Sequence, residues 1–295
     1  LLINQNNISQ GSPCFIIAEA GVNHNGDIKK AKKLIDLAYD AGADAIKFQS
    51  FNSEKLVAPS CRKAEYQVNE KNNESHLAML RKFQLAKNET EKLFNYCKKK
   101  DIIFLSTPYD EENIDFLEKL NVPAFKVSSP DIVNVPLIRS IGKKGKPVII
   151  STGTAELDEI NFAVDIIEKT GNTNIIILHC ISAYPTMIKD VNLNVIRTLI
   201  DLYDYPIGFS DHTMDIEISL AAVAMGACVI EKHFTLDKND DGPDHASSLD
   251  PNELFNLVRY IRNIEKAKGD SKKVLTAEVL KNKEIGERKV FFIKD

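Results

Sequence analysis

Eight short apolar segments occur along the chain with longer amphipathic segments between them. This alternation constrains the fold more than any other feature of the sequence. Each apolar segment is a nearly continuous hydrophobic run of strand length, which is typical of parallel strands covered on both faces. The segments are Cys14–Ala20, Ala45–Gln49, Ile102–Thr107, Ala124–Ser128, Pro147–Thr152, Ile175–Cys180, Ile207–Asp211 and Cys228–His233. We therefore expect a parallel sheet.

The intervening segments carry the periodicity of amphipathic helices. In Ile28–Ala41, Leu34 and Ile35 share one face, and lysines occupy the opposite face. The other helical patterns are Glu89–Lys100, Glu111–Leu120, Glu156–Thr170, Leu193–Leu202, Asp215–Met225 and Asn252–Ala267. This alternation predicts an α/β fold, the (β/α)8 or TIM barrel, over residues 14–270, after a lead-in at residues 1–13. A doubly wound open sheet is the alternative, but it usually has fewer strands and a glycine-rich first turn, which this chain lacks.

The composition excludes several classes of protein. The chain has 295 residues, of which 43% are hydrophobic, and a formal net charge of −4, so it can bury a core and is not disordered. Acidic residues outnumber basic ones, which argues against a nucleic-acid partner. No apolar run approaches the roughly 20 residues of a membrane span, and the first residues lack the pattern of a signal peptide. Because the five cysteines are widely spaced and odd in number, we expect reduced thiols and a cytoplasmic protein.

Polar and charged residues end nearly every apolar segment. A charge buried without a partner destabilises a fold, whereas a barrel brings the C-terminal ends of its strands to one mouth, where the active sites of this fold lie. The strand-end residues are Glu19, Lys47, Gln49, Ser106, Thr107, Lys126, Ser128, Ser129, Ser151, Thr152, His179, Ser210, Asp211, His212, Glu231, Lys232 and His233. We therefore expect an active site there. The polar segment Ser50–Lys87 is too long for a simple loop, so we expect an extended loop with some helix that partly covers the site.

Two lysines, Lys47 and Lys126, are flanked by core residues and should point into the barrel. They could be buried ion-pair partners of Glu19 or Asp131. Alternatively, one of them could form a Schiff base, because burial makes a lysine nucleophilic. A site for an anion carrying a phosphate and a carboxylate is favoured, since several hydroxyls accompany the two ammonium groups. Those hydroxyls belong to Thr107, Ser129, Ser151 and Ser210.

Two histidines, His212 and His233, end strands that are neighbours in a barrel, so both imidazoles can reach one point. Two neutral imidazoles with open positions for oxygen ligands suit a divalent transition-metal ion acting as a Lewis acid. A structural role is the alternative for each ring. Glu231 and Asp211 alternate with the histidines and could orient them, although Asp211 should point away.

Other carboxylates and histidines have weaker signals. Glu19 ends the first strand and could move a proton at a carbonyl oxygen or stabilise a cationic intermediate. Asp244, in the acidic last loop, is expected to contact a sugar hydroxyl. His24 lies in NHNG, which could equally be a simple turn. We expect His76 and His179 to be structural.

The strand-end motifs resemble those of the sialic acid synthase family. In chain order they are AEAGVNHNGD, AIKFQS, STPYD, FKVSS, STGT, HCISAYPT, GFSDHT and IEKHFTLDKNDDGPDH. The resemblance covers about residues 12–270. That family contains N-acetylneuraminate, legionaminate and pseudaminate synthases and related spore-coat polysaccharide enzymes.

The resemblance implies a metal-dependent transferase built on a TIM barrel with a small antifreeze-like domain after it. Such an enzyme condenses phosphoenolpyruvate with an open-chain amino sugar, giving a nine-carbon 2-keto acid and phosphate. His212 and His233 would hold Mn2+, with Mg2+ or Co2+ as alternatives, and Glu19 would sit at the reacting carbons. The phosphoenolpyruvate ligands would be Lys47, Thr107, Lys126, Ser129, Ser151 and Ser210, and the sugar ligands Gln49, Tyr184 and Asp244.

Among acceptors, the resemblance favours N-acetylmannosamine, giving N-acetylneuraminate; the alternative is 2,4-diacetamido-2,4,6-trideoxymannose, the legionaminate precursor. A Schiff-base aldolase and a barrel that binds sugar or phosphate without turnover are further alternatives. Ser182 stands where neuraminate synthases often have asparagine, and Pro130 where glycine is common. The family also implies a homodimer. The chain ends at ERKVFFIKD, about where the antifreeze-like domain would begin, so we expect residues 271–295 to be a linker toward a domain that is absent or truncated.

Overall fold

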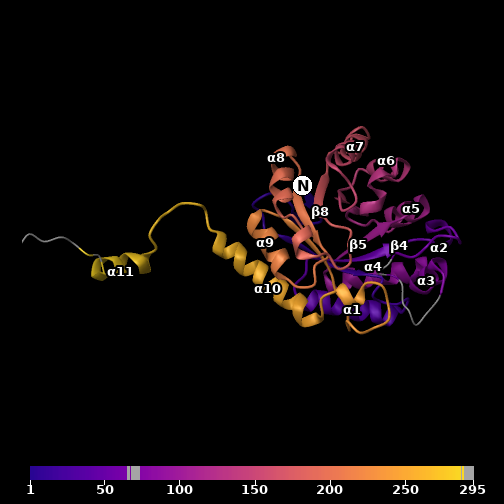
Figure 1. The fold of residues 1–295 in the computed structure, drawn as a ribbon, viewed down its shortest axis with the longest axis horizontal. Coiled ribbons are helices and arrows are strands. Elements are labelled where there is room, and N and C mark those ends of the chain that lie inside the picture. The colour runs from indigo at the N-terminus through magenta and orange to yellow at the C-terminus, as the bar shows by residue number, and fades with distance from the viewer. Residues whose placement is uncertain (65–66, 68–73, 287, 289–295) are drawn as a thin grey trace, which may run out of the picture.

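Eight parallel strands in the described part of the chain form one sheet that curves into a barrel (Figure 1). The computed structural model describes residues 1–64, 67, 74–286 and 288. The strands are β3 (Phe15–Gly21), β4 (Ala45–Ser50), β5 (Ile103–Pro108), β6 (Phe125–Val127), β7 (Val148–Ser151), β8 (Ile175–Cys180), β9 (Ile207–Asp211) and β10 (Val229–His233). Their order is β5-β4-β3-β10-β9-β8-β7-β6, and β5 lies beside β6. The predicted TIM barrel is confirmed, with each strand within two residues of its expected position.

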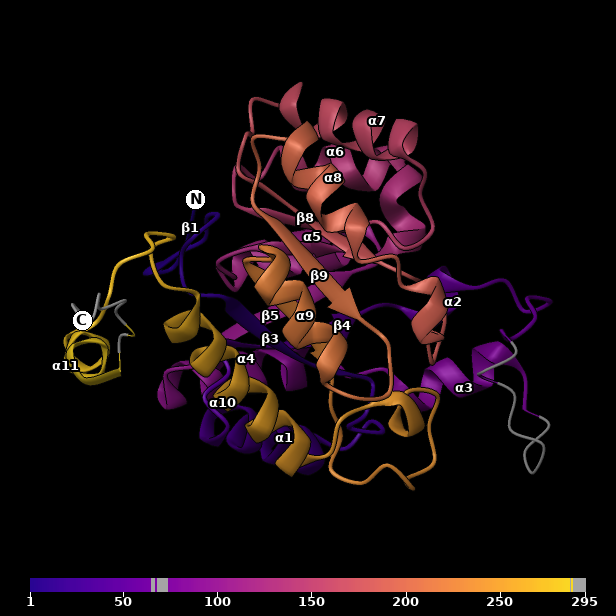
Figure 2. The same ribbon diagram turned by 60° about the vertical axis from the view of Figure 1, so that its left-hand side comes forward.

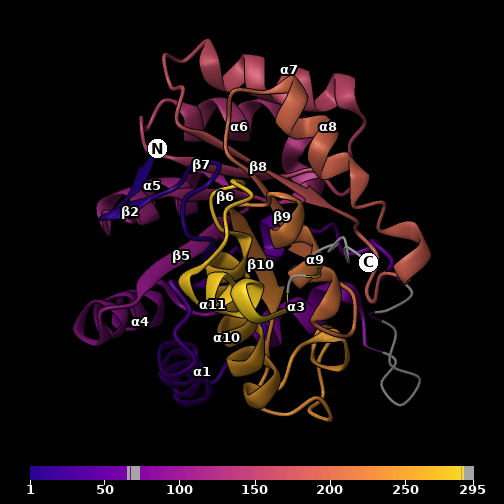
Figure 3. The same ribbon diagram turned by 90° about the vertical axis from the view of Figure 1, so that its left-hand side faces the viewer.

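Helices surround the barrel and alternate with its strands (Figures 2 and 3). They are α1 (Ile28–Asp40), α4 (Lys87–Lys100), α5 (Glu111–Lys119), α6 (Val135–Gly142), α7 (Leu157–Glu168), α8 (Asn194–Leu202), α9 (Glu217–Met225) and α10 (Pro251–Lys268). All were expected except α6, which follows a 3-10 turn at Ser129–Val133.

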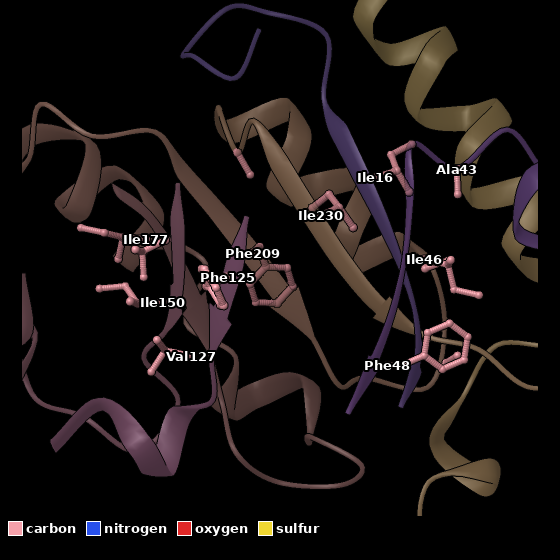
Figure 4. Close-up of a cluster of buried hydrophobic side chains, with 14 of the residues drawn as sticks. Ile16, Ala43, Ile46, Phe48, Phe125, Val127, Ile150, Ile177, Phe209 and Ile230 are labelled. Atoms are coloured by element: carbon pink, nitrogen blue, oxygen red, sulfur yellow. The ribbon is translucent and has the colours of Figure 1, made fainter. Parts of the chain in front are cut away.

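Successive side chains of each strand point to opposite faces of the sheet, so the barrel has an outer and an inner hydrophobic layer. Residues such as Ile16, Ile46 and Phe209 point outward and pack beneath the helices (Figure 4). Inward residues such as Phe15 and Ile17 fill the N-terminal half of the barrel. Because a strand has a period of two, the next inward positions toward the C-terminal end carry the polar residues of the mouth.

The first residues form a hairpin that continues the inner core. Strands β1 (Leu2–Ile3) and β2 (Asn6–Asn7) pair antiparallel, with Asn4 in the left-handed conformation between them. Ile3 and Ile8 are buried in the inner apolar cluster. The segment predicted only as a lead-in therefore covers the N-terminal end of the barrel.

Two further helices belong to the segment after β4. Helix α2 (Ser53–Leu56) and helix α3 (His76–Phe83) lie between β4 and α4, and an apolar cluster that includes Phe51, Met79 and Phe83 holds this segment against the mouth. The prediction of an extended loop with some helix is confirmed for the described residues; residues 65–66 and 68–73, which include most of NEKNNESH, lie outside them.

The C-terminal helix stands apart from the barrel. Helix α11 (Ala277–Gly286) buries none of its residues, and Figure 1 shows it beyond the end of α10. No helix among the described residues has the length and apolarity that crossing a membrane requires. All five cysteines are free thiols, as expected.

Candidate active site

A cavity of about 600 Å3 opens at the C-terminal ends of the barrel strands. All twelve residues assigned to the candidate site line it: Glu19, Lys47, Gln49, Thr107, Lys126, Ser129, Ser151, Tyr184, Ser210, His212, His233 and Asp244. They come from seven strands or the loops that follow strands, so only the closed barrel brings them together.

The two histidines lie side by side at the ends of β9 and β10. Their ring centroids are 5.5 Å apart, and the Tyr184 ring lies 4.1 Å from that of His212 and 5.9 Å from that of His233. Because strands β9 and β10 pair in register, their inward end positions meet on the same side of the mouth. The predicted juxtaposition is confirmed.

Hydrogen bonds define which ring nitrogens remain available. Nδ1 of His212 lies 2.8 Å from the Ile181 carbonyl oxygen, an atom that can only accept, so this nitrogen carries the proton and Nε2 is left with its lone pair. In His233, the buried Nδ1 has no hydrogen-bond partner among the described residues and lies 3.9 Å from an Asp244 carboxylate oxygen. Each imidazole therefore keeps one nitrogen that can accept a ligand.

Two lysines and two glutamates form a buried charged cluster that lines the same cavity as the histidines. Lys47 Nζ lies 2.8 Å from Glu19 Oε2 and 3.6 Å from Glu231 Oε2. Lys126 Nζ lies 3.8 Å from Glu231 Oε1 and donates to Ser151 Oγ at 2.6 Å. The alternative of a Lys47–Glu19 ion pair is thus observed too, but within the cavity rather than in the core.

Burial shifts the pKa of Glu19 and Lys126 in this cluster, whereas at Glu231 the neighbouring lysines reverse the effect of burial. Burial raises the pKa of Glu19, and the nearby Glu231 carboxylate adds to that shift although Lys47 opposes it. Burial also disfavours a charged Glu231, but Lys126 and Lys47 outweigh it and lower the pKa of that carboxyl. Burial lowers the pKa of Lys126, with Glu231 opposing the shift. The cluster therefore places two lysines beside one ionised carboxylate, Glu231, and a second carboxyl, Glu19, that can hold a proton near neutrality.

The hydroxyls surround the lysines. Thr107 Oγ1 accepts from Lys47 Nζ at 3.3 Å, and Ser210 Oγ donates to Glu231 Oε1 at 3.0 Å. Ser129 Oγ accepts from the Gly153 backbone N–H at 2.9 Å. Ser151 Oγ accepts from Lys126 Nζ, and Ser129 lines the same cavity from the end of β6.

The outward strand ends behave differently. Asp211 and Lys232 precede the two histidines and point away from the cavity, where they form an ion pair of 2.9 Å with both side chains buried. Asp211 also accepts from the Thr213 backbone N–H and the Ser219 hydroxyl. The expectation that Asp211 points away is confirmed, and Asp131 pairs with the Ser128 hydroxyl rather than with a lysine.

Two histidines whose rings lie outside the cavity, His179, predicted to be structural, and His24, left open by the sequence, both have structural contacts. His179 Nε2 is 2.8 Å from the Val191 carbonyl oxygen, and His24 Nδ1 accepts from the Gly26 backbone N–H at 3.0 Å. NHNG is therefore a turn held by its own histidine. His76 differs, because it lines the cavity from α3.

Two sets of lining residues have no place in the sequence prediction. Cys180 lies at the end of β8 with its sulfur 3.7 Å from His212 Nδ1; its inward position could have been read from strand alternation. The second set is an apolar wall of Val22, Leu56, Val57, Met79, Leu80 and Phe83. These side chains come from loops and short helices, where no periodic pattern in the sequence predicts which residues face the mouth.

Comparison with known proteins supplies the family. A family model described as the NeuB family matches residues 34–273. The chain belongs to the NeuB family. Among relatives of this NeuB-family chain, the N,N'-diacetyllegionaminic acid synthase of Campylobacter jejuni is 47% identical over 95% of this chain and 85% of its own length. The N,N'-diacetyllegionaminic acid synthase of Legionella pneumophila is 46% identical over 88% of this chain and 74% of its own length.

A solved structure supports the same family. The crystal structure of the N-acetylneuraminic acid (sialic acid) synthetase from Leptospira borgpetersenii superposes with a TM-score of 0.85 at 39% identity, covering 98% of each chain. The predicted membership of the sialic acid synthase family is thereby confirmed for this NeuB-family chain.

Proposed function

We propose that this protein is a nonulosonate synthase that condenses phosphoenolpyruvate with an open-chain amino sugar and releases phosphate. The observation that carries the proposal is the cavity in which two neighbouring imidazoles face two buried lysines. The named activities of its NeuB-family relatives support the same reaction class.

Phosphoenolpyruvate has two anionic groups, and the cluster offers two ammonium groups with hydroxyls between them. We assign Lys47, Lys126, Thr107, Ser129, Ser151 and Ser210 to this substrate, with Gln49, Tyr184 and Asp244 on the sugar side. Charge-assisted hydrogen bonds to phosphate and carboxylate are about twice as strong as neutral ones. Binding would also bring further negative charge to Lys126, whose nearest carboxylate in the described structure, Glu231, also faces Lys47.

We assign His212 and His233 to a divalent ion, Mn2+ first, with Mg2+ or Co2+ as alternatives. The donor set fits because each ring keeps one nitrogen free to accept a ligand. No group of three or more His, Cys, Asp or Glu side chains in the described residues is arranged to hold a metal, so the remaining positions would belong to substrate or water. When bound, such an ion supplies Lewis acidity toward the sugar aldehyde.

Glu19 is placed to serve the reacting carbons. The methylene carbon of phosphoenolpyruvate forms a bond to the aldehyde carbon, whose oxygen takes the proton of the Glu19 carboxyl and becomes a hydroxyl. The adjacent carbon of phosphoenolpyruvate becomes cationic. A carboxylate at this point stabilises that charge, and Glu19 then takes the proton of the water that adds there. The resulting phosphohemiketal loses phosphate by C–O cleavage and leaves the 2-keto acid. Holding both substrates in one cavity contributes about 7–11 kcal/mol through orientation.

For the acceptor, we propose 2,4-diacetamido-2,4,6-trideoxymannose ahead of N-acetylmannosamine, which the sequence motifs alone favour. Both legionaminic acid synthases are more similar to this chain than the neuraminic acid synthetase is. The apolar wall of the cavity also suits a sugar with a methyl group at C6 and a second acetamido group. A methylene-scale difference in such a pocket is worth about 1–3 kcal/mol.

A side-by-side assay tests the proposal. Phosphate release should require phosphoenolpyruvate, an acceptor and a divalent ion together, and kcat/KM should be about 10- to 200-fold higher with the diacetamido sugar. Release that continues at the same rate in excess chelator contradicts the metal assignment. A higher kcat/KM with N-acetylmannosamine returns the acceptor to the neuraminate type.

The Schiff-base alternative has one observation in its favour, the lowered pKa of the buried Lys126. Borohydride treatment with pyruvate serves as the control in the same assay. An aldolase retains a covalent adduct on its lysine, whereas the proposed synthase retains none. The homodimer and the cytoplasmic location remain predictions of the family resemblance and the composition; sedimentation of the full chain tests the dimer.

A further inference from the structure

The NHNG turn after β3 takes no part in the proposed chemistry, yet its two asparagines bond to the last loop of the barrel, which follows the neighbouring strand β10. Asn23 Nδ2 donates to the Phe234 carbonyl and to Ser248 Oγ, both at 2.9 Å. Asn25 Nδ2 donates to the Asp241 carbonyl at 2.9 Å, and its Oδ1 lies 3.1 Å from His245 Nε2. The beginning and the end of the barrel are thus joined above the site.

These bonds lead directly to Asp244. Ser248 Oγ, which accepts from Asn23, donates to the Asp244 carbonyl at 2.6 Å. His245, the neighbour of Asp244, is held from both sides, because its Nδ1 lies 2.6 Å from Thr235 Oγ1. The residue that faces the cavity is therefore fixed through its own carbonyl and through the next residue.

The two loops also fit closely. A Cβ atom on Gly242 would lie 2.6 Å from His245 Cδ2 and 3.2 Å from Asn25 Oδ1. A Cβ atom on Gly21 would lie 3.5 Å from Asp244 Oδ2 and 3.4 Å from His233 Cε1. Glycines at these two places let the loops approach one another and leave Asp244 room beside His233.

We propose that Asn23 and Asn25 are positioning residues for Asp244, and we name the set Asn23, Asn25, His245 and Ser248 the asparagine clasp. The inference rests on the proposed function, because it uses the assignment of Asp244 to the sugar. A long loop on a barrel rim samples many conformations unless it is tied down. The clasp holds this loop in the one conformation that presents a carboxylate to the acceptor, and small misplacements of such groups are costly to binding and rate.

Asn25→Gly is the variant that tests the clasp most directly. Asn25 has a φ of +51°, a left-handed conformation that glycine adopts without strain, so the change removes the side chain alone. Asn121→Gly is the matched control, because Asn121 has a φ of +58°, bonds only to Lys146 at the surface through its side chain in the described structure, and precedes β6 at the far end of the barrel.

The expected result is a split between the two substrates. With Asn25→Gly, the KM for the acceptor sugar should rise about tenfold, which corresponds to about 1.4 kcal/mol, while the KM for phosphoenolpyruvate stays within about twofold. Amide hydrogen exchange in residues 237–248 should accelerate in Asn25→Gly and remain as in the wild type in Asn121→Gly. A role in stability alone would move both KM values together or neither.

Asp244→Ala separates failure of the inference from failure of the proposed function. If Asp244→Ala raises the acceptor KM and Asn25→Gly does not, the clasp inference is overturned and the proposed function stands. If Asn25→Gly raises the KM for phosphoenolpyruvate as much as that for the sugar, the clasp inference is overturned as well. If Asp244→Ala leaves the acceptor KM unchanged, the sugar assignment fails and the inference fails with it. If the wild-type enzyme releases no phosphate with either acceptor, the proposed function itself is wrong.

Discussion

Individual residues at the ends of β9 and β10 show how one strand can carry both chemistry and stability. His212 and His233 point into the cavity, and the preceding residues Asp211 and Lys232 point outward into a buried ion pair. Lys232 Nζ also donates to the Thr213 carbonyl at 2.6 Å. A buried ion pair is stable only when its remaining hydrogen-bonding capacity is used, and here the turn after β9 supplies most of it.

Removing one member of this pair should therefore be severe. Lys232→Met leaves Asp211 charged and buried, so we expect the free energy of unfolding to fall by about 3–5 kcal/mol in urea titrations. The double variant Asp211→Asn with Lys232→Met should recover part of that loss. The control is Lys169→Met, which breaks the exposed Lys169–Asp165 pair and should cost at most about 1 kcal/mol. Equal losses in the two lysine variants would show that burial does not govern the Lys232 pair.

Most of the cavity could be predicted because strand ends obey a period of two. That rule and the family motifs found all twelve assigned residues, and the same rule places Glu231 inward, two residues before His233. The sequence interpretation treated Glu231 only as an orienter of histidines, whereas it lies between Lys47 and Lys126. The apolar wall could not be predicted, because Met79 and Leu80 reach the mouth only through the way α3 packs.

At the scale of elements, long periodic segments were predictable and short ones were not. Helix α6 was missed although Leu137, Ile138 and Ile141 form its buried face, because its 8 residues hold only one repeat of that spacing. Its boundary signals were present: Asn134 accepts from the Leu137 backbone N–H, and a proline lies in the first turn. The N-terminal hairpin was missed because two-residue strands carry no period at all.

Helix α10 closes the barrel, and its first turn depends on one cap. Asp250 Oδ1 accepts from the backbone N–H groups of Asn252 at 2.8 Å and Glu253 at 2.9 Å. In turn, the Glu253 carboxylate accepts from the Asp250 backbone N–H. Asp250→Ala should lower the free energy of unfolding by about 1 kcal/mol, measured by urea titration. Asp250→Asn retains an accepting oxygen, so its free energy of unfolding should fall by only a few tenths of the loss that Asp250→Ala causes. Equal destabilisation by alanine and asparagine would mean that the cap contributes nothing specific.

At the scale of the whole molecule, several buried imidazoles make stability depend on pH. Burial lowers the pKa of His24 to about 4, with His245 adding to the shift. Burial also lowers the pKa of His179 and of His245. An unfolded chain binds protons at these residues near pH 6.5, so the unfolded state takes up protons that the folded state refuses.

The sign of the effect follows from that difference. Because the folded pKa of His24 lies below its unfolded value, its contribution is fully present above about pH 6.5 and is lost as the pH falls toward 4. The shift corresponds to about 3 kcal/mol. Asp244 has the opposite effect on stability, because burial raises its pKa to about 6. The folded protein takes up a proton at Asp244 as the pH falls, so the destabilisation from its buried charge disappears over the same pH range. The wild-type protein should therefore lose less stability in acid than its histidines alone would cause.

Replacing His24 isolates its share of this balance. His24→Phe loses the bond from the Gly26 N–H, so the variant should be less stable than the wild type at pH 7.5. Because phenylalanine binds no proton, the difference in free energy of unfolding between the wild type and His24→Phe should shrink by about 2–3 kcal/mol between pH 7 and pH 4.5. Urea unfolding across this range measures both curves, with Asn121→Gly as a variant whose difference from the wild type should not change with pH. Parallel curves for His24→Phe and the wild type would show that His24 titrates alike in the folded and unfolded chain, and that its burial in the NHNG turn does not shape acid stability.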